Sequence, residues 1–406
     1  MEVVVERCCG LDVHKKNVVA CVHTPESEQV RTYGTVTREL LRLLDWLQQE
    51  EVTALAMEST GSYWKPVYNL FEGQGIKQTV VNPAHMKAVP GRKTDVKDAQ
   101  WIADLLRHGL LRSSRIPERP QRELQEAVRY RQKLIETRSD EVRRVQKVLE
   151  GGNIKLGDVA ADILGKSGRA MLVALIGGET DSSRMAELAQ GQLRKKREAL
   201  GLALEGSIGP HQRFMLQHLL EHIDFLEQRI EEISVEIETR MRPFEPALEA
   251  LDAIPGIGRR SAETIVAEVG TDMSYWPNDK AFASWAKICP GNNESAGKRR
   301  SSSIGQGNQS LRGALVEAAQ SAVRVKDSYF SALYYRLKAR RGAKRALVAV
   351  AHAILVVIYH MLKDGTFYQD LGRDYFDHRD RQAIVQRNVR RLENLGYQVT
   401  LSPLVA

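Results

Sequence analysis

The chain has 406 residues, which is enough for two or three domains that each bury a core of their own. Its hydrophobic fraction of 43% and charged fraction of 27% are ordinary for a soluble globular protein, and no apolar stretch reaches the roughly 18 to 20 residues that cross a bilayer, which disfavours a membrane-spanning chain. The net charge of +8 favours a polyanionic partner.

The first residues and the cysteines indicate the cellular compartment. A secretory signal is not expected, because Glu2, Glu6 and Arg7 place charges, two of them negative, within the first residues. The cysteines have no C-x-x-C spacing and no histidine at zinc-ligand spacing, so we expect buried free thiols instead of a metal finger. They are Cys8, Cys9, Cys21 and Cys289. Reduced thiols are typical of the cytosol, and we expect a cytoplasmic protein of a bacterium or archaeon.

Residues 1–115 alternate between strand and helix patterns. The sequence predicts strands at 2–13, 17–23, 29–36, 52–60 and 76–83, and helices at 37–50, 62–75 and 93–109. The resulting order is β-β-β-α-β-α-β-α. Three antiparallel strands followed by strands that helices join are typical of an α/β ribonuclease-H-like (RuvC-like) domain.

Four acids are expected at one edge of this sheet. Asp12 lies inside an apolar strand, where a carboxylate is costly unless a cation meets it. Glu58 ends the fourth strand, beside Asp12 in such a sheet, and Asp95 and Asp98 lie three residues apart on one helix face. Carboxylates this close repel one another unless a cation neutralises them, and Mg²⁺ (or Mn²⁺) prefers such oxygen ligands together with a phosphodiester. Singly, Glu58 and Asp95 could instead cap helices.

Residues 116–244 are predicted to be a helical, coiled-coil region. Apolar residues recur at helical spacing over 124–149, where Arg131 and Arg138 interrupt the seam. From Leu216 to Ile237 the apolar steps alternate between three and four residues, which is typical of a coiled coil within one chain or between two. An insertion at about 150–212 carries mixed signals.

Residues 245–365 are predicted to form a mainly helical domain, followed by a tail at 366–406 with one helical pattern and no assigned chemistry. The run "IPGIG" before a helix is similar to a helix-hairpin-helix turn, in which Gly256, Gly258 and Arg259 would approach a nucleic-acid phosphate. The alternative is an ordinary glycine-rich turn. The apolar run at 346–362 contains two histidines, which favours a buried helix.

The positive charge is concentrated in this domain. Residues 296–345 contain twelve lysines and arginines against two acids, and because the whole chain carries +8, the remainder sums to −2. A basic region beside a neutral remainder is typical of a nucleic-acid-binding protein. The alternative is a basic face that only contacts solvent.

Several motifs resemble those of one family. "GLDVHK", "MESTGSYW", "VNPAHMKAVPGRKTDVKDA" and "IPGIG…NNESAGKRR…GQGNQSLRGAL" are similar to the DEDD transposases of bridge-RNA-guided insertion sequences. Those proteins join a RuvC-like domain to a serine-bearing transposase domain through a coiled-coil region. The resemblance covers roughly 5–115 and 245–365. It puts the family's four acids on Asp12, Glu58, Asp95 and Asp98, and its nucleophile on Ser295, which the residues alone do not distinguish from the nearby serines at 301, 302, 303 and 310.

The resemblance implies a mechanism and partners. Ser295 would attack a phosphodiester and form a phosphoserine link that conserves the bond energy for rejoining. Nearby basic residues would contact the nucleic-acid backbone: Lys298, Arg299, Arg300 and Arg312. The partners would be double-stranded DNA at the element ends and target, a structured non-coding guide RNA, and further copies of the chain in a dimer of dimers, with no membrane.

Three other readings compete with this one. A metal-only RuvC-type, structure-selective endonuclease would use the acids alone, and its C-terminal domain would serve only to bind DNA. An ATP-binding sugar kinase or actin-like protein is suggested by "GLDVHKKN", but the second glycine-rich phosphate loop of that fold is missing from the sequence. The four acids disfavour a non-catalytic RNA-binding remnant.

Overall fold

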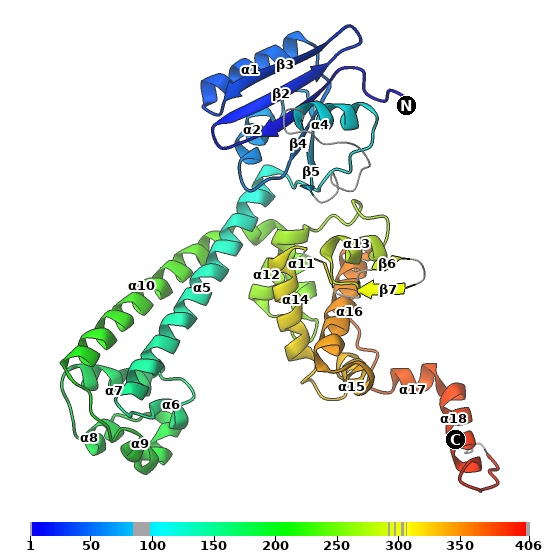
Figure 1. The fold of residues 1–406 in the computed structure, drawn as a ribbon. Coiled ribbons are helices and arrows are strands. Elements are labelled where there is room, and N and C mark those ends of the chain that lie inside the picture. Colours follow the sequence, from blue (N-terminus) through cyan, green and yellow to red (C-terminus); the bar gives the residue numbers. More distant parts are fainter. Residues whose placement is uncertain are drawn as a thin grey trace. The chain divides into compact units, whose positions relative to one another are not determined.

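The structure is a computed structural model that describes residues 2–83, 98–290, 293–295, 298–301, 304–305 and 307–402, with side chains of 293–295 and 298–301 outside the description. The chain divides into two compact units, Met1–Glu118 and Arg119–Ala406 (Figure 1). Each unit has its own hydrophobic core.

A mixed five-stranded sheet forms the centre of the first unit. Its strands are β1 (Cys8–Val13), β2 (Asn17–His23), β3 (Glu28–Gly34), β4 (Ala54–Glu58) and β5 (Lys77–Val81). The spatial order is β3-β2-β1-β4-β5; β1, β2 and β3 pair antiparallel, whereas β4 pairs parallel with both β1 and β5. This order is compatible with the ribonuclease-H-like topology predicted from the sequence.

Helices cover both faces of the sheet because the side chains of each strand alternate between them. Helices α1 (Thr37–Gln49) and α2 (Trp64–Phe71) pack on the face that contains Leu11. Helix α4 (Asp98–Arg107) packs on the opposite face, against Cys8 and the alanines of β4. All three helices fall within their predicted ranges.

Helix α4 lies unusually close to β1, and Gly10 makes this possible. A Cβ atom at Gly10 would lie 2.2 Å from the carbonyl oxygen of Ala99 and 2.3 Å from the amide nitrogen of Ala103. Both contacts are to backbone atoms, which cannot rotate away. Only glycine therefore lets the helix backbone rest directly on the strand.

Replacing Gly10 with alanine should push α4 off the sheet. Overpacking of this kind costs about 2 kcal/mol or more, so the free energy of unfolding of the first unit should fall by that amount in urea denaturation. Gly201→Ala is the control, because a Cβ at that helical position would meet nothing within 4 Å. An unchanged midpoint for Gly10→Ala would show that the helix is not held in this position.

The first strand begins at Cys8, so the predicted start at residue 2 is wrong. The backbone amides of Val4 and Val5 both donate to the carbonyl oxygen of Arg107, at 2.9 and 3.1 Å. The segment therefore ends α4 instead of extending the sheet, and Val4 remains 66% exposed.

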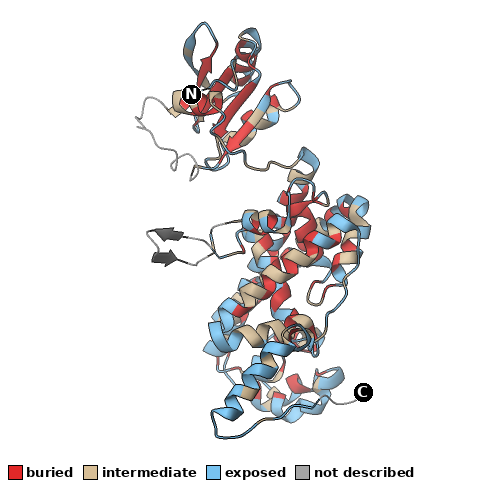
Figure 2. Cartoon of the chain, turned by 90° about the vertical axis from the view of Figure 1, so that its right-hand side faces the viewer, coloured by how far each residue is buried: buried red, intermediate tan, exposed pale blue. Residues whose placement is uncertain are grey.

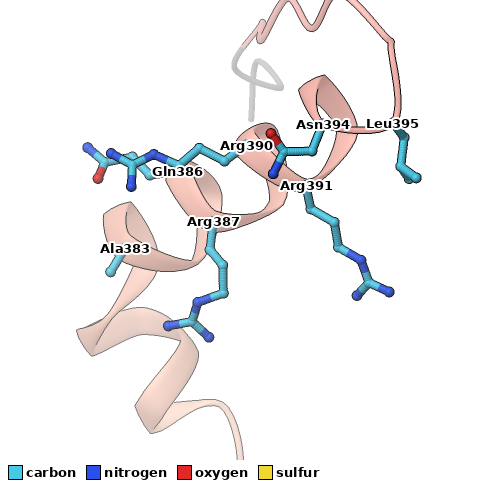
Figure 3. Close-up of a pocket in the computed structure, with 7 residues that line it drawn as sticks. All are labelled: Ala383, Gln386, Arg387, Arg390, Arg391, Asn394 and Leu395. Atoms are coloured by element: carbon cyan, nitrogen blue, oxygen red, sulfur yellow. The ribbon is translucent and has the colours of Figure 1, made fainter.

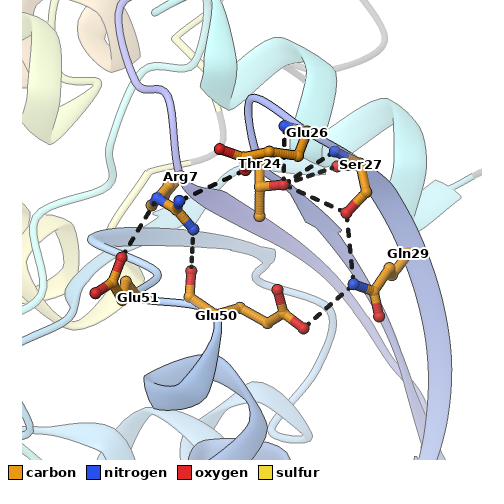
Figure 4. Close-up of polar contacts among 7 residues, drawn as sticks. All are labelled: Arg7, Thr24, Glu26, Ser27, Gln29, Glu50 and Glu51. Carbon is orange, nitrogen blue, oxygen red and sulfur yellow. Dashed lines mark hydrogen bonds and ion pairs between the residues drawn. The ribbon is translucent and has the colours of Figure 1, made fainter.

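Arg7 connects the start of β1 to two neighbouring turns (Figure 4). Its Nη1 donates to the carbonyl oxygen of Glu50 at 3.0 Å, after the end of α1. The guanidinium also pairs with Glu26 at 3.5 Å, in the β2–β3 turn, and with Glu51 at 3.7 Å. Because these groups are largely exposed, the pairs contribute little energy, but they fix the direction in which the chain enters the sheet.

Two long helices form an antiparallel arm in the second unit: α5 (Arg119–Gly151) and α10 (Pro210–Met241). Their apolar seams face each other within one chain, and Arg240 pairs with Glu123 at one end. The insertion is a small helical cap at the far end with its own core. It consists of α6 (Leu156–Val159), α7 (Lys166–Ile176), α8 (Ser182–Glu187), a 3₁₀ turn (Gly191–Lys196) and α9 (Arg197–Ala203).

The arginines that interrupt the α5 seam have acidic partners. Arg138 donates from Nε to Glu227 of α10 at 2.8 Å. Arg131 is 4% exposed and donates to Glu263 at 2.6 Å, outside the helix pair. The coiled-coil pattern is interrupted at Arg131 because this side chain reaches Glu263 of the C-terminal helices, while Leu124 and Val128 still cluster with Ile237 and Met241 of α10.

The C-terminal part of the second unit consists mainly of helices, several of which bury residues in a shared core (Figure 2). They are α11 (Glu245–Asp252), α12 (Arg259–Val269), α13 (Asp279–Ala286), α14 (Gln309–Ala322), α15 (Tyr329–Arg341), α16 (Ala343–Asp364), α17 (Tyr375–Arg379) and α18 (Arg381–Glu393), preceded by a 3₁₀ turn at Arg242–Phe244. Helix α16 is long and apolar enough to cross a membrane by composition. Its side chains from Ala346 to Met361 nevertheless contribute to the core that α13, α14 and α15 share, as predicted for a buried helix.

Glu268 of α12 joins three elements at the base of the arm. Its side chain is buried, and its two carboxylate oxygens accept from Arg129 of α5, each at 2.7 Å. The Oε2 atom also accepts from the side-chain amide of Asn308 at 2.5 Å. Asn308 in turn caps α14 by accepting from the amide of Leu311. One carboxylate thus connects the arm, α12 and the start of α14.

Candidate functional site

Asp12 and Glu58 lie at neighbouring positions on adjacent strands. Strands β1 and β4 are parallel, and Leu11 pairs with Met57 in their register. One residue further along each strand, Asp12 and Glu58 leave the sheet on the same face, because alternation places both opposite to Leu11. The prediction that Glu58 lies beside Asp12 agrees with this register.

Helix α4 directs Asp98 toward the same edge. The helix runs antiparallel to β1: the carbonyl of Arg107 contacts residues before the strand, the carbonyl of Ala103 accepts from the thiol of Cys8, and Ala99 lies over Gly10. Asp98, the first residue of the helix, therefore lies toward the end of β1 that carries Asp12. Asp95, the fourth predicted acid, is outside the described residues.

Polar groups already contact two of these acids. The Nε2 atom of His14 lies 3.0 Å from Oδ2 of Asp12, whose side chain is 24% exposed. The hydroxyl of Thr60 donates to Oε1 of Glu58 at 2.8 Å. The sequence analysis did not identify His14 as a site residue. Its position two residues after Asp12, where an extended chain returns to the same side, could have indicated the contact.

The donor set fits a hard divalent cation. The ends of β1 and β4 and the start of α4 place Asp12, Glu58 and Asp98 at the same edge of the sheet, although among the described residues their carboxylate oxygens do not all lie within 4.8 Å of one another. Water and a phosphate oxygen could complete the coordination of a cation bound there. When bound, such a cation neutralises charge on a phosphodiester and on its attacking oxygen. A family that uses a DEDD set of acids is consistent with divalent metal use.

Ser295 lies in a short hairpin of the second unit that the sequence did not predict. Strand β6 (Asn293–Ser295) pairs antiparallel with β7 (Lys298–Ser301), and Ser295 stands opposite Lys298 in the register. Ser295 is therefore the last residue of β6, next to the turn. Lys298, Arg299 and Arg300 occupy β7, so the backbone brings three basic residues beside the serine.

The residues of the "IPGIG" turn have structural contacts of their own. Gly256 has φ +90°, and a Cβ there would lie 2.2 Å from the carbonyl of Ala318 in α14. Arg259 pairs with Glu245, which raises the pKa of the guanidinium, and with Glu263 at 2.9 Å. Gly258 precedes α12 as its N-terminal cap. Contact of these residues with nucleic acid stays a prediction.

Arg312 lies near the start of α14, close to the hairpin in sequence. Its Nη1 donates to the carbonyl of Gly305 at 3.4 Å, a long bond that leaves the other donors of the guanidinium available. Asn308 caps the start of α14, and its side-chain amide donates a hydrogen bond to the carboxylate of Glu268. A role for Arg312 in contacting a phosphate is compatible with this position.

A second group of metal-ligating residues lies elsewhere on the sheet. Ligand atoms of Cys21, His23 and Glu28 are within 4.8 Å of one another, so the expectation that no histidine accompanies a cysteine is wrong here. Burial raises the pKa of the Cys21 thiol to about 12, and Arg107 lies 3.4 Å from Nδ1 of His23. The positive guanidinium of Arg107 beside His23 disfavours a cation at this position. In the register His23 pairs with Cys8, at the opposite end of β1 from the acids.

Comparison with known proteins identifies both units. A family model for transposases of the IS110 type with a DEDD set matches residues 9–154, and a model described as a transposase of the IS116/IS110/IS902 family matches residues 248–335. The chain is also 26% identical over 311 residues to the insertion element IS110 uncharacterized 43.6 kDa protein of Streptomyces coelicolor, a match that covers 69% of this chain and 73% of that protein. Each model matches less than half of the chain, and the two matches lie in different units. Together with the relative, these matches support a DEDD transposase of the IS110 type.

Proposed function

We propose that this transposase cuts and rejoins DNA through a phosphoserine intermediate on Ser295, at a centre where Asp12, Glu58, Asp95 and Asp98 hold Mg²⁺, and that a guide RNA selects the DNA. The observation that carries the proposal is the convergence of β1, β4 and the start of α4. The backbone of these elements puts Asp12, Glu58 and Asp98 at one edge of the sheet, which supports a shared cation site there.

The reaction proposed at Ser295 is a transesterification, which exchanges one phosphate ester for another and needs no further reactant. The serine Oγ attacks phosphorus and loses its proton to a base, while the bond from phosphorus to the leaving deoxyribose oxygen breaks and that oxygen takes up a proton. The new phosphoserine ester replaces the broken phosphodiester. A deoxyribose hydroxyl of the other strand then attacks the ester, which rejoins DNA and releases Ser295.

The position of Ser295 supports this role. A residue at a hairpin turn can approach a DNA strand more closely than one in a helix core, and Lys298 stands directly across the hairpin. Basic groups next to the attacked phosphate stabilise the charge that develops on its oxygens. The resemblance to the family adds that Ser295 acts at the acids of another copy of the chain, in a dimer of dimers.

The guide RNA and its role come from the family resemblance. The basic window around the hairpin is compatible with a nucleic acid whose sequence is read by base pairing instead of by side chains, because such contacts need only the backbone. The protein would then supply the chemistry and hold the strands.

Trapping of a covalent adduct separates this proposal from a hydrolytic nuclease. The protein is incubated with the non-coding RNA that flanks its element, Mg²⁺ and labelled DNA that spans the element ends, then denatured, and DNA-linked peptides are mapped by mass spectrometry. We expect an adduct on Ser295 that requires the RNA. Cleaved DNA without an adduct would favour the metal-only endonuclease, and an adduct that forms without RNA would remove the guide from the proposal.

A further inference from the structure

We infer that helix α18 binds the phosphate backbone of duplex DNA through its arginine face. This inference deepens the proposed function, since it rests on DNA as the substrate, but it concerns a surface remote from Ser295 in sequence. The face consists of Gln386, Arg387, Arg390, Arg391 and Asn394 on a 13-residue helix (Figure 3).

The arginines of α18 share one side of the helix. Arg387, Arg390 and Arg391 are spaced by three and four residues, which at 3.6 residues per turn brings their side chains together. The only acid of the helix, Glu393, lies three residues after Arg390 at the Gln386 edge of this face, so the three arginines outnumber it there. The helix is about 20 Å long at 1.5 Å per residue, which is enough to follow several phosphates.

These arginines differ from those around them in their pairing. Arg336 and Arg379 both bind Asp380, and Arg373 binds Asp327. By contrast, within the described part of the chain the guanidinium groups of Arg387 and Arg390 form no hydrogen bond or ion pair, and the same is true of Arg391. All three are exposed. Three neighbouring positive charges without acidic partners repel one another, and an anionic polymer relieves that repulsion.

The start of the helix is firmly anchored. Arg379 and Arg336 hold the pKa of Asp380, the residue before α18, at about 2, so the anchor stays ionised at any working pH. Phe376 of α17 stacks on Tyr329 of α15 with 5.3 Å between ring centroids. The helix beyond this anchor has no buried residue. The first residues of α18 are therefore held to the rest of the unit, while the remainder of the helix is exposed and can contact a partner outside the chain.

Duplex DNA fits this helix better than duplex RNA. A helix with its side chains is about 10–12 Å wide, which matches the major groove of B-DNA, about 12 Å wide. The major groove of A-form RNA is too deep and narrow to admit it. Arginine and amide side chains on one face can then reach phosphates on both sides of the groove.

Arg381 supplies a matched control on the same helix. It lies about 180° around the helix from Arg390, beside the apolar stripe of Val385, Val389 and Leu392. Replacing it with alanine removes one positive charge from the side opposite to Arg390, so its matched partner is the single variant Arg390→Ala. Comparison of these two variants separates the position of a charge from net charge.

The test measures binding of full-length protein in the Ser295→Ala background and without divalent cations, so that neither a serine nucleophile nor a metal-only nuclease cuts the DNA. Affinity for a duplex DNA oligonucleotide of arbitrary sequence is measured by fluorescence anisotropy over a range of salt concentrations. We expect the triple variant Arg387→Ala, Arg390→Ala and Arg391→Ala to bind at least tenfold more weakly at 0.1 M salt and to lower the slope of log K against log salt by about 2 to 3. Arg381→Ala should change the affinity less than twofold, and the triple lysine variant should keep most of the binding because lysine keeps the charge.

Each other outcome overturns the inference. Unchanged DNA binding by the triple alanine variant does so, and so does an equal loss in Arg381→Ala. Two parallel arms use duplex RNA of the same length and anionic lipid vesicles; a loss confined to either one assigns the face to that partner instead of DNA. Thermal melting of each variant checks that folding is intact. Because no step needs Ser295, failure of the phosphoserine proposal would leave this result readable.

Discussion

Ser295→Ala should abolish strand exchange while binding of DNA and RNA stays at the wild-type level. Removal of the attacking oxygen leaves no route to a phosphoserine, so the rate should fall by about 10⁴-fold or more. The assay follows joined products from labelled element ends, with binding measured in parallel. The substitution removes a single oxygen at the end of β6 and should not disturb the hairpin register.

The neighbouring serines are the controls for this experiment. Ser302→Ala, in the same basic segment, should exchange strands at the wild-type rate. If Ser302→Ala is inactive and Ser295→Ala is active, the nucleophile has been assigned to the wrong residue. If both are active, the chain does not use a serine nucleophile in this region, and the hydrolytic nuclease becomes the better description.

Asp12→Asn should lower the rate of strand cleavage by about 10³-fold, because it removes one negative charge from the ligand set with almost no change of shape. The loss should be partly recovered in Mn²⁺, and chelation of divalent ions should stop the wild-type protein entirely. Cleavage is measured on labelled DNA, and folding is checked by thermal melting.

Asp104→Asn is the matched control for Asp12. Asp104 is also an aspartate of the first unit, lies on α4 and pairs with His108, but it is half a helix away from Asp98. It should cleave at the wild-type rate. Full activity of Asp12→Asn would remove the metal centre from the proposal, since no other described acid lies in the middle of β1.

Long regular elements could be predicted from the sequence, and their register placed part of the site. The run at 17–23 coincides with β2, because its apolar residues and its neighbours favour the same structure. Asp12 and Glu58 followed from strand order alone, since parallel neighbours end at the same edge. Asp98 was expected near them because it lies at the start of the predicted helix.

Other features depend on contacts that no local pattern contains. The β6–β7 hairpin consists of three- and four-residue strands rich in charged residues, so it lacks the apolar alternation by which a strand is recognised. Grouping of Cys21, His23 and Glu28 requires the cross-strand register of β2 and β3. The valines before Cys8 have the composition of a strand, yet the backbone amides of Val4 and Val5 donate to the carbonyl of Arg107 at the end of α4 instead of to a neighbouring strand.

The pairing of Arg131 with Glu263, and of Arg129 with Glu268, has a mechanical consequence. Breaking the buried pair of Arg131 and Glu263 would leave an uncompensated charge at a cost of about 3–5 kcal/mol, whereas the half-exposed Arg129 makes its pair with Glu268 weaker. Helix α5, about 50 Å long from its 33 residues, is therefore held to α12 by these two ion pairs at the base of the arm. A force applied at the helical cap is delivered to α12 instead of being lost in bending. Through Glu268 and Asn308 it reaches the start of α14, a few residues after the hairpin that carries Ser295.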